Sequence, residues 1–370
     1  MSKSLNSVPL TLARYLSGRY LLTLLYFLTG LLALIYMLDL VELLRRAGKQ
    51  ENVPLGIVLT MGLYKLPDVG QVVLPFAILF SGMYTFWTLT KQYELAVMRA
   101  AGLSVWQFLL PILMVGCLCG VLHVTLINPL SALLLDRFEQ YETKYLGTQK
   151  HLVSVFQNGF WIREKETKAG EVILHAEKID PDNWQLKNVM GLAFNENDSH
   201  TSRLDARSAQ LQDGYWLFRD VHITQKGTEN QIRDTYKLAT SLTRKDIEES
   251  FSNPETISFW NMPSFIKTLE ATGFDSTQLK IHYHYLLSLP VLFMSMILLA
   301  AAVSFQPPRS SYTFIMILTG IGLGLLIFFL SSYLQALGSS GQISAPLAAW
   351  SPAIITFLLG MSALLTIEDG

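Results

Sequence analysis

The sequence predicts an α-helical membrane protein that carries one inserted all-β domain outside the membrane. The first observation is composition: 51% of the 370 residues are hydrophobic and 15% are charged, whereas soluble domains carry about 25% charged residues. The second is that charges are absent from five long stretches and concentrate in one central region, at about 137–272. The third is that this region alternates apolar and polar residues, a pattern typical of half-buried antiparallel strands.

Six membrane-spanning helices follow from the charge-free stretches. A helix needs roughly 20 predominantly apolar residues to cross a bilayer core, and each stretch has about that length or more. The last stretch is interrupted by LGSSGQISAP (337–346) and therefore predicts two spans. The apolar segment 53–67 is short, and we expect an interfacial or re-entrant helix there. The expected spans are 16–41, 68–90, 101–130, 282–304, 311–336 and 345–366.

The central region is predicted to form about eight short strands in a sandwich or jelly roll. Its alternating segments include HLVSVFQNGFWIRE, GEVILHAEKI and NWQLKNVMGLAFNE, and PDNW (181–184) is one of the turns between them. The period then changes, and Phe265, Ile266 and Leu269 fall on one face of a helix that ends at Gly273. This amphipathic helix is expected to lead back into the fourth span.

The basic residues of the short loops predict the orientation. With six alternating spans, the basic residues before span one, between spans two and three and between spans four and five all fall on one side. The positive-inside rule makes that side the cytoplasm. Both termini are then cytoplasmic and the β-domain is outside. The basic residues are Lys3, Arg14, Arg19, Lys91, Arg99 and Arg309.

One charged cluster lies on the other side, at the outer end of span one. Glu42 precedes Arg45 by three residues and Arg46 by four, so an ion pair within the helix is available. One interpretation is a solvated helix end whose side chains snorkel to water. The other is a site for an anionic headgroup, because ionisable groups near a span indicate function by default. The cluster comprises Asp39, Glu42, Arg45, Arg46 and Lys49, and Arg137 at the end of span three could join it.

A short charged segment, TLTKQYELAVMRAAGLSVWQF (88–108), joins spans two and three. Its composition favours a helix at about 90–101, with Gly102 as the C-cap. Leu95, Met98 and Ala101 share one face, and Glu94 and Arg99 lie at its edge. Such a helix can dock into a groove of another protein, as in the permease half of an ATP-driven transporter. The alternative is a helical loop that lies on the bilayer surface.

The sequence lacks the motifs of several classes of enzyme and nucleotide-binding protein. The sequence contains no G-x-x-x-x-G-K-[ST] phosphate loop and no H-E-x-x-H zinc motif. It also contains no nucleophile elbow. TGIGLG (319–324) lies within a span and is predicted to be a helix-packing surface rather than a nucleotide loop. We therefore expect no enzymatic activity, no catalytic or metal site and no cofactor bound by this chain.

The sequence resembles the LptF/LptG permease family over essentially the whole chain. The resemblance is carried by KQYELAVMRAAGLS (91–104), by LYKLPDVGQVVLPFAILF (63–80) and by LKIHYHYLLSLPVLFMSMILLAAAVSF (279–305). LDLVELLRRAGKQ (38–50) and the absence of a basic tail are closer to the LptG branch. This family forms the membrane part of the lipopolysaccharide-export ABC transporter of Gram-negative inner membranes.

The resemblance implies partners and roles for particular residues. It implies a heterodimer with an LptF-like permease, two LptB-like ATPase subunits that hold ATP and Mg, an LptC-like single-span protein, and no nucleic acid. Glu94, with Leu95, Met98 and Arg99, is expected to contact the ATPase. Arg45, Arg46, Lys49 and Arg137 are expected to contact the lipid headgroup. Asp39 stands where LptG proteins often have a basic residue, which places that phosphate contact in doubt.

The resulting prediction is a permease that extracts lipopolysaccharide from the inner membrane and passes it to a periplasmic jelly-roll bridge. The expected domains are 1–136 with three spans, 137–272 with the periplasmic β-domain and its connecting helix, and 273–370 with three more spans. One alternative is a permease for another envelope lipid or for lipoproteins, which would not need Arg45 and Arg46. Another is a scaffold without transport, which would tolerate Glu94→Arg.

Overall fold

The computed structural model divides the chain into two compact units, each described by itself. The membrane unit comprises Met1–Leu146, Ser258–Trp260 and Lys280–Gly370, and the β-unit comprises Gly147–Ile257 and Asn261–Leu279. The residues described are 9–50, 53–146, 152–156, 159–166, 170–180, 185–194, 200–212, 214–225, 231–240, 254–272, 275–305 and 312–369. Lys3, the turn at 181–184, Gly273 and Arg309 lie outside these ranges.

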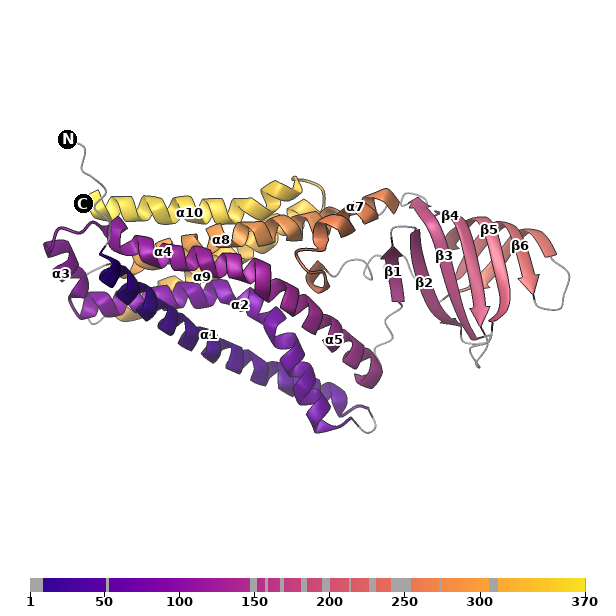
Figure 1. The fold of residues 1–370 in the computed structure, drawn as a ribbon, viewed down its shortest axis with the longest axis horizontal. Coiled ribbons are helices and arrows are strands. Elements are labelled where there is room, and N and C mark those ends of the chain that lie inside the picture. Colours follow the sequence, from indigo (N-terminus) through magenta and orange to yellow (C-terminus); the bar gives the residue numbers. More distant parts are fainter. Residues whose placement is uncertain are drawn as a thin grey trace. The chain divides into compact units, whose positions relative to one another are not determined.

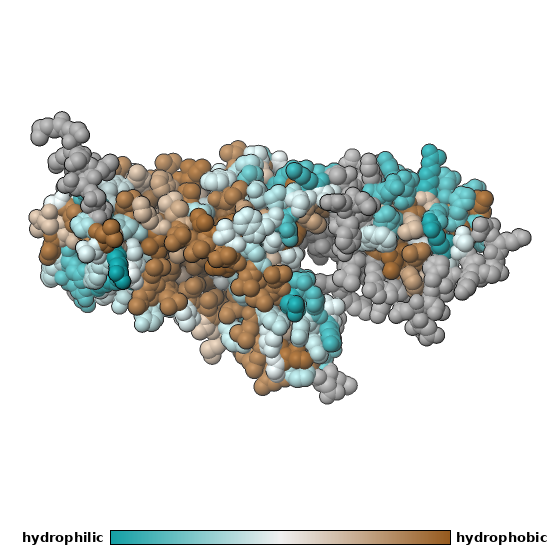
Figure 2. All heavy atoms as spheres, viewed as in Figure 1, coloured by the Kyte–Doolittle hydropathy of each residue, from teal (hydrophilic) through white to brown (hydrophobic). Residues whose placement is uncertain are grey.

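Six helices in the described part of the chain are long and apolar enough to cross a membrane. This confirms the predicted fold class of three spans, an inserted antiparallel β-domain and three further spans (Figure 1). Hydrophobic side chains cover much of the face of this unit that Figure 2 shows. The six are Leu10–Ala47, Leu55–Lys91, Val105–Leu146, Thr277–Ser304, Thr313–Ser339 and Ala345–Thr366.

The first span is peripheral and the fourth is central. Within its most apolar window, α1 (Leu10–Ala47) has 11% of its residues buried, whereas α8 (Thr277–Ser304) has 72%. The helices α9 (Tyr312–Ser339) and α10 (Ala345–Asp369) lie between these extremes. α1 therefore presents most of its surface to lipid or to another protein.

The prediction of a separate interfacial helix at 53–67 was wrong. α2 runs without interruption from Leu55 to Lys91 and contains Pro67 and Pro75. Proline removes one backbone hydrogen bond and usually kinks or ends a helix, which is why the sequence predicted a boundary. In a membrane protein the freed carbonyl can be accommodated by neighbouring helices, so proline does not force an end.

The third span is a composite of three helical segments. Ser104 starts α4 (Val105–Leu122) through a capping box: its hydroxyl accepts from Gln107 N–H, and the Gln107 side chain accepts from Ser104 N–H. One π-helical turn, η1 (His123–Ile127), leads into α5 (Asn128–Leu146). The helix therefore continues well beyond the predicted limit at residue 130.

Two pairs of glycines allow close helix packing. Gly116 and Gly120 of α4 face α8, where a Cβ on Gly120 would lie 2.4 Å from Pro290 Cα. Gly320 and Gly324 of α9 face α2, with Met83 against Gly320. Association of helices in lipid depends on such small residues, because lipid chains are as apolar as leucine. The interpretation of TGIGLG as a packing surface is thus confirmed.

The β-unit contains one antiparallel sheet whose described strands follow the order of the chain. We expected about eight strands in a sandwich or jelly roll, whereas the described residues form seven strands, each paired with the next. Period-two alternation identifies a strand with one buried face but does not determine its neighbours. The strands are β1 Leu152–Phe156, β2 Gly159–Glu166, β3 Gly170–Asp180, β4 Gln185–Phe194, β5 His200–Gln212, β6 Tyr215–Gln225 and β7 Gln231–Ala239.

One face of the sheet carries the core of this unit. The buried side chains share cross-strand rows, for example Ala176, Val189, Ala206 and Val221 on β3 to β6. The chain then passes through a 3-10 turn (Pro254–Thr256) to α7 (Met262–Thr272), on which Ile266 and Leu269 are buried as predicted. The remaining buried core residues are Ile162, Val172, Leu174, Leu186, Ala209, Leu211, Trp216 and Phe218.

Replacing Gly120 by alanine should weaken the packing of α4 on α8. The new Cβ would collide with Pro290, and overpacking of this kind costs about 1–3 kcal/mol. A thiol-reactive dye can follow unfolding, since Cys117 and Cys119 are free cysteines on the same helix. Gly30→Ala is the matched control, because nothing lies within 4 Å of its added Cβ. Equal losses of stability in both variants would contradict this packing role.

Replacing Trp216 by alanine should open the sheet. Trp216 is fully buried in the core of the β-unit, and Trp→Ala in a core costs about 3–5 kcal/mol. Hydrogen–deuterium exchange of the full-length protein should accelerate in β5 and β7, which flank β6. Ile232→Ala on β7 removes a side chain that is 73% exposed and should leave exchange unchanged. Unaltered exchange in Trp216→Ala would disprove the assignment of this face as the core.

Candidate functional site

The segment between spans two and three forms a short helix with defined ends. Lys91 ends α2, and Tyr93 adopts a left-handed conformation with φ of 60° before α3 (Glu94–Ala100) begins. At the other end, Gly102 has φ of 85°. Its N–H donates to Arg99 O, and Leu103 N–H donates to Met98 O, which together form a Schellman motif. The chain direction is therefore fixed on both sides of α3.

The carboxylate of Glu94 is held by the first span. Arg19 Nη1 lies 2.8 Å from Glu94 Oε1 and 2.7 Å from Tyr15 Oη, and Tyr15 Oη lies 3.1 Å from Glu94 Oε2. Arg19 Nη2 donates to the side chain of Gln92 over 2.6 Å. The sequence analysis used Arg19 only as a topology signal. The spacing of Tyr15 and Arg19, one helical turn apart, would have placed them on one face.

The exposed apolar surface of α3 differs from the face expected from the sequence. Leu95 is buried against its own chain and Met98 is half-buried, whereas Arg99 is exposed. The large exposed apolar side chains are Tyr93, just before α3, and Val97, at 68% and 67% exposure, and Ala101 of the expected face is exposed as well. A helical face is defined by sequence spacing, but which face is covered depends on the spans beside it.

The opposite end of α1 carries the second charged cluster. Arg45 donates two hydrogen bonds to Glu42, over 2.8 and 2.7 Å. Arg46 pairs with Glu142 of α5, so the two arginines expected at the headgroup already have carboxylate partners. The predicted Glu42–Arg45 ion pair is present, whereas the partner of Arg46 lies on another helix.

Asp39 also has an ionic partner. Lys65 Nζ of α2 lies 2.9 Å from Asp39 Oδ1. An acidic residue at position 39 is thus neutralised by a lysine that the sequence reading placed in an apolar segment and did not assign to the site. The pair joins α1 to α2 at the level where the charged cluster begins.

Lys49 and Arg137 are the exposed basic residues of this cluster without an ion pair in the described part of the chain. They belong to a small three-helix assembly formed by the ends of α1 and α5 and the start of α2. Its hydrophobic core holds these helix ends together: Leu43, Ala47, Val58, Met61, Leu135, Phe138 and Leu146.

A single helix therefore contributes residues to both candidate sites. Arg19 and Arg45 are 26 residues apart on α1, which corresponds to about 39 Å at 1.5 Å per residue. A bilayer core is about 30 Å thick. The Glu94 network and the basic cluster consequently lie at opposite ends of one membrane-spanning element.

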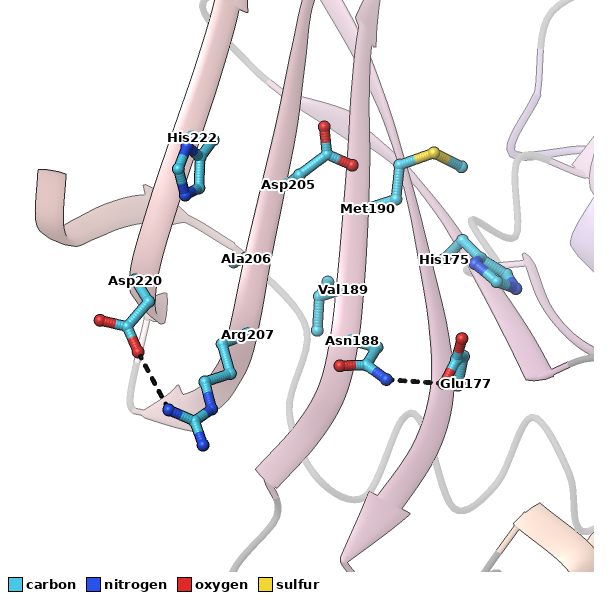
Figure 3. Close-up of a pocket in the computed structure, with 10 residues that line it drawn as sticks. All are labelled: His175, Glu177, Asn188, Val189, Met190, Asp205, Ala206, Arg207, Asp220 and His222. Atoms are coloured by element: carbon cyan, nitrogen blue, oxygen red, sulfur yellow. Dashed lines mark hydrogen bonds and ion pairs between the residues drawn. The ribbon is translucent and has the colours of Figure 1, made fainter. Parts of the chain in front are cut away.

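The polar face of the β-unit carries an open pocket of about 520 Å³ (Figure 3). His175, Met190, Asp205 and His222 form one cross-strand row on β3 to β6. Asp205 accepts two hydrogen bonds from Arg203 over 2.8 Å, which raises the pKa of that guanidinium.

Neighbouring polar side chains in this pocket are also paired with one another. Asn188 donates to Glu177 over 2.7 Å, and Arg207 lies 4.0 Å from Asp220. Among the described residues, no three histidine, cysteine or acidic side chains are placed to bind a metal. The pocket is an open part of the sheet surface lined by paired polar side chains.

Comparison with known proteins agrees with this architecture. The family model described as "Lipopolysaccharide export system permease LptF/LptG" matches residues 14–366. The lipopolysaccharide export system permease protein LptG of Escherichia coli K12 is 23% identical over 365 residues, which cover 96% of this chain and 98% of that protein. The LptG protein of Haemophilus influenzae is 23% identical over 356 residues, which cover 94% and 96%. Because the matched range covers nearly the whole chain, including Arg19 and Arg45 of α1, the chain belongs to the LptF/LptG family of lipopolysaccharide export permeases.

Proposed function

We propose that this chain is a permease subunit that extracts lipopolysaccharide from the inner membrane and delivers it to a periplasmic β-bridge. The observation that carries the proposal is the single helix α1, which holds the Glu94 helix at one end and the basic cluster at the other. The family membership and the names of the relatives supply the cargo. Both termini are then cytoplasmic and the β-unit is periplasmic, as the loop charges predict.

The short helix α3 is the proposed docking element for an ATPase. It projects Tyr93 and Val97 as exposed apolar side chains and has Glu94 and Arg99 at its rim. An apolar anchor surrounded by charges suits a helix that enters a groove of a partner. ATP and Mg would be held by two copies of that ATPase, and a second, LptF-like permease and an LptC-like single-span protein would complete the assembly.

The outer cluster is the proposed headgroup contact. Lys49 and Arg137 offer exposed positive charge there, while Arg45 and Arg46 are held by carboxylates that a phosphate would have to displace. Extraction is costly because each buried CH2 group of a lipid contributes about 0.8 kcal/mol. That scale explains why a multi-chain lipid requires coupling to ATP hydrolysis.

The β-unit is the proposed exit. Its sheet has one apolar face, and antiparallel strands with one buried face can line a hydrophobic path for acyl chains. ATP-driven movement of α3 would close the membrane cavity and push the lipid toward this unit.

A permease for a less anionic envelope lipid or lipoprotein is the second candidate. The ion pairs that neutralise Asp39, Arg45 and Arg46 favour it, because they leave little net charge around those arginines. A scaffold without transport, the third hypothesis, would have no use for a docking helix.

Replacing Glu94 by arginine should release the ATPase. The change removes a carboxylate whose Oε1 lies 2.8 Å from Arg19 Nη1, and it places a second cation next to Arg19. The tagged chain is purified in mild detergent, and co-purifying proteins and lipids are identified by mass spectrometry. Glu255→Arg makes the same charge change at an exposed position of the β-unit and should keep the ATPase. Retention of the ATPase by Glu94→Arg would reject α3 as its docking element.

Replacing Lys49 and Arg137 by glutamine should weaken lipopolysaccharide binding by about tenfold or more. Each basic residue near an anionic surface contributes about 1 kcal/mol, and about 1.4 kcal/mol is tenfold in affinity. Bound lipopolysaccharide can be quantified in the purified complex, with Arg219→Gln on the β-unit as an exposed control. If the double variant binds normally, these two residues do not contact the headgroup. If the double variant loses a bound neutral lipid as well as lipopolysaccharide, the loss reflects misfolding and not a missing headgroup contact.

A further inference from the structure

The contacts of Glu94 with α1 indicate a role in addition to docking of the ATPase. We propose that Arg19 is a positioning residue that ties Glu94, the carboxylate that the proposed function places against the ATPase, to α1, so that Glu94 bridges α1 and the ATPase. The proposal rests on the proposed function, in which α3 meets an ATPase. It makes α1 the element that receives the movement and carries it to the opposite end of the membrane unit.

Hydrogen bonds to three side chains hold the guanidinium group of Arg19 in one orientation. Nη1 contacts Glu94 and Tyr15, and Nη2 contacts Gln92, all within 2.6–2.8 Å. A planar guanidinium loses less conformational freedom per hydrogen bond than an ammonium group would. Arg19 therefore holds the end of α2 and the start of α3 in one orientation against α1.

Glu94 still has acceptor capacity for a second cation. An ionised carboxylate has about four acceptor positions. In the described residues, Oε1 accepts from Arg19, and the single Tyr15 hydroxyl proton is shared between Oε1 and Oε2. The side chain is 32% exposed, so part of it can be reached from outside the chain. A partner cation can bind Glu94 without displacing Arg19.

Arg19 lies on a part of α1 that cannot move alone. Leu16 and Tyr20 on the same helix are fully buried. Tyr20 donates to Ile78 O of α2 over 3.4 Å, and Ser17 donates to Pro111 O of α4 over 3.5 Å. A force on the Arg19 side chain therefore acts on the packed helix and not on the side chain only.

α1 is also an unbroken connection between the two ends of the unit. It contains no proline, whereas α2 contains Pro67 and Pro75 and the third span contains a π-helical turn. At its far end, Asp39 pairs with Lys65 of α2 and Arg46 pairs with Glu142 of α5. A shift of α1 must therefore strain these pairs, which surround the proposed headgroup contact.

The test uses the purified complex with its ATPase and compares Arg19→Gln with Arg14→Gln. Both residues are basic and lie on α1, but Arg14 has no ion pair in the described residues. Three quantities are measured: ATPase retention, lipopolysaccharide delivered to a soluble acceptor per ATP hydrolysed, and the nucleotide-driven distance change between spin labels. The labels are placed at Val41 and Leu133, exposed positions of α1 and α5.

Arg19→Gln is expected to keep the ATPase and its hydrolysis but to lose the nucleotide-driven distance change and most delivery per ATP. Arg14→Gln should match the parent protein. Equal behaviour of the two variants would overturn the proposal. Loss of the ATPase in Arg19→Gln would also overturn it, because the arginine would then only shape the docking helix.

The charge swap Arg19→Glu with Glu94→Arg separates bridging from a purely structural ion pair. The swap restores an ion pair within the chain, so thermal stability should return to that of the parent. Residue 94 would now repel the partner cation, so the ATPase should still be lost. Full recovery of retention and delivery would show a structural pair and reject the bridge. If the parent complex itself holds no ATPase, the proposed function fails rather than this inference.

Discussion

The structure depends on one constraint: within a bilayer, every backbone N–H and C=O must find its partner inside the protein. The six spans meet it as helices, and the prolines of α2 show that the helix persists even where one backbone hydrogen bond is missing. Because lipid is as apolar as the helix surfaces, no hydrophobic force drives the helices together, and their association depends on close packing. Gly116 and Gly120 supply that packing for α4 and α8, which makes α8 the centre of the unit.

Charged side chains are consequently confined to the two ends of the helices, where they act in pairs. At one end Arg19 holds Glu94; at the other, Asp39 and Arg46 join α1 to neighbouring helices. α1 is the most exposed of the spans, and its ion pairs connect it to neighbouring segments at both ends. A permease needs such an element, because the ATPase and the lipid headgroup are on opposite sides of the membrane in the proposed function.

The β-unit distributes its polar and apolar side chains differently from the membrane unit. Its strands are solvated on one face, as the pocket with Arg207 and Asp220 illustrates, and apolar on the other, around Trp216. Consecutive pairing of the strands needs only short connections. An apolar face made of neighbouring strands is continuous across the sheet, which is the feature on which the proposed exit path rests.

The sequence by itself determined the six spans, the inserted β-domain and the two charged segments, because hydrophobic length and period depend on local composition alone. It also identified the family, through motifs spread over the chain. Only the tertiary structure decided that α2 is one helix, that Leu95 is covered, and that Glu94, Asp39 and Arg46 have partners 75, 26 and 96 residues away in the chain. Ion pairs and covered faces depend on which helices become neighbours, and that choice follows from packing of the whole unit, which no local pattern encodes.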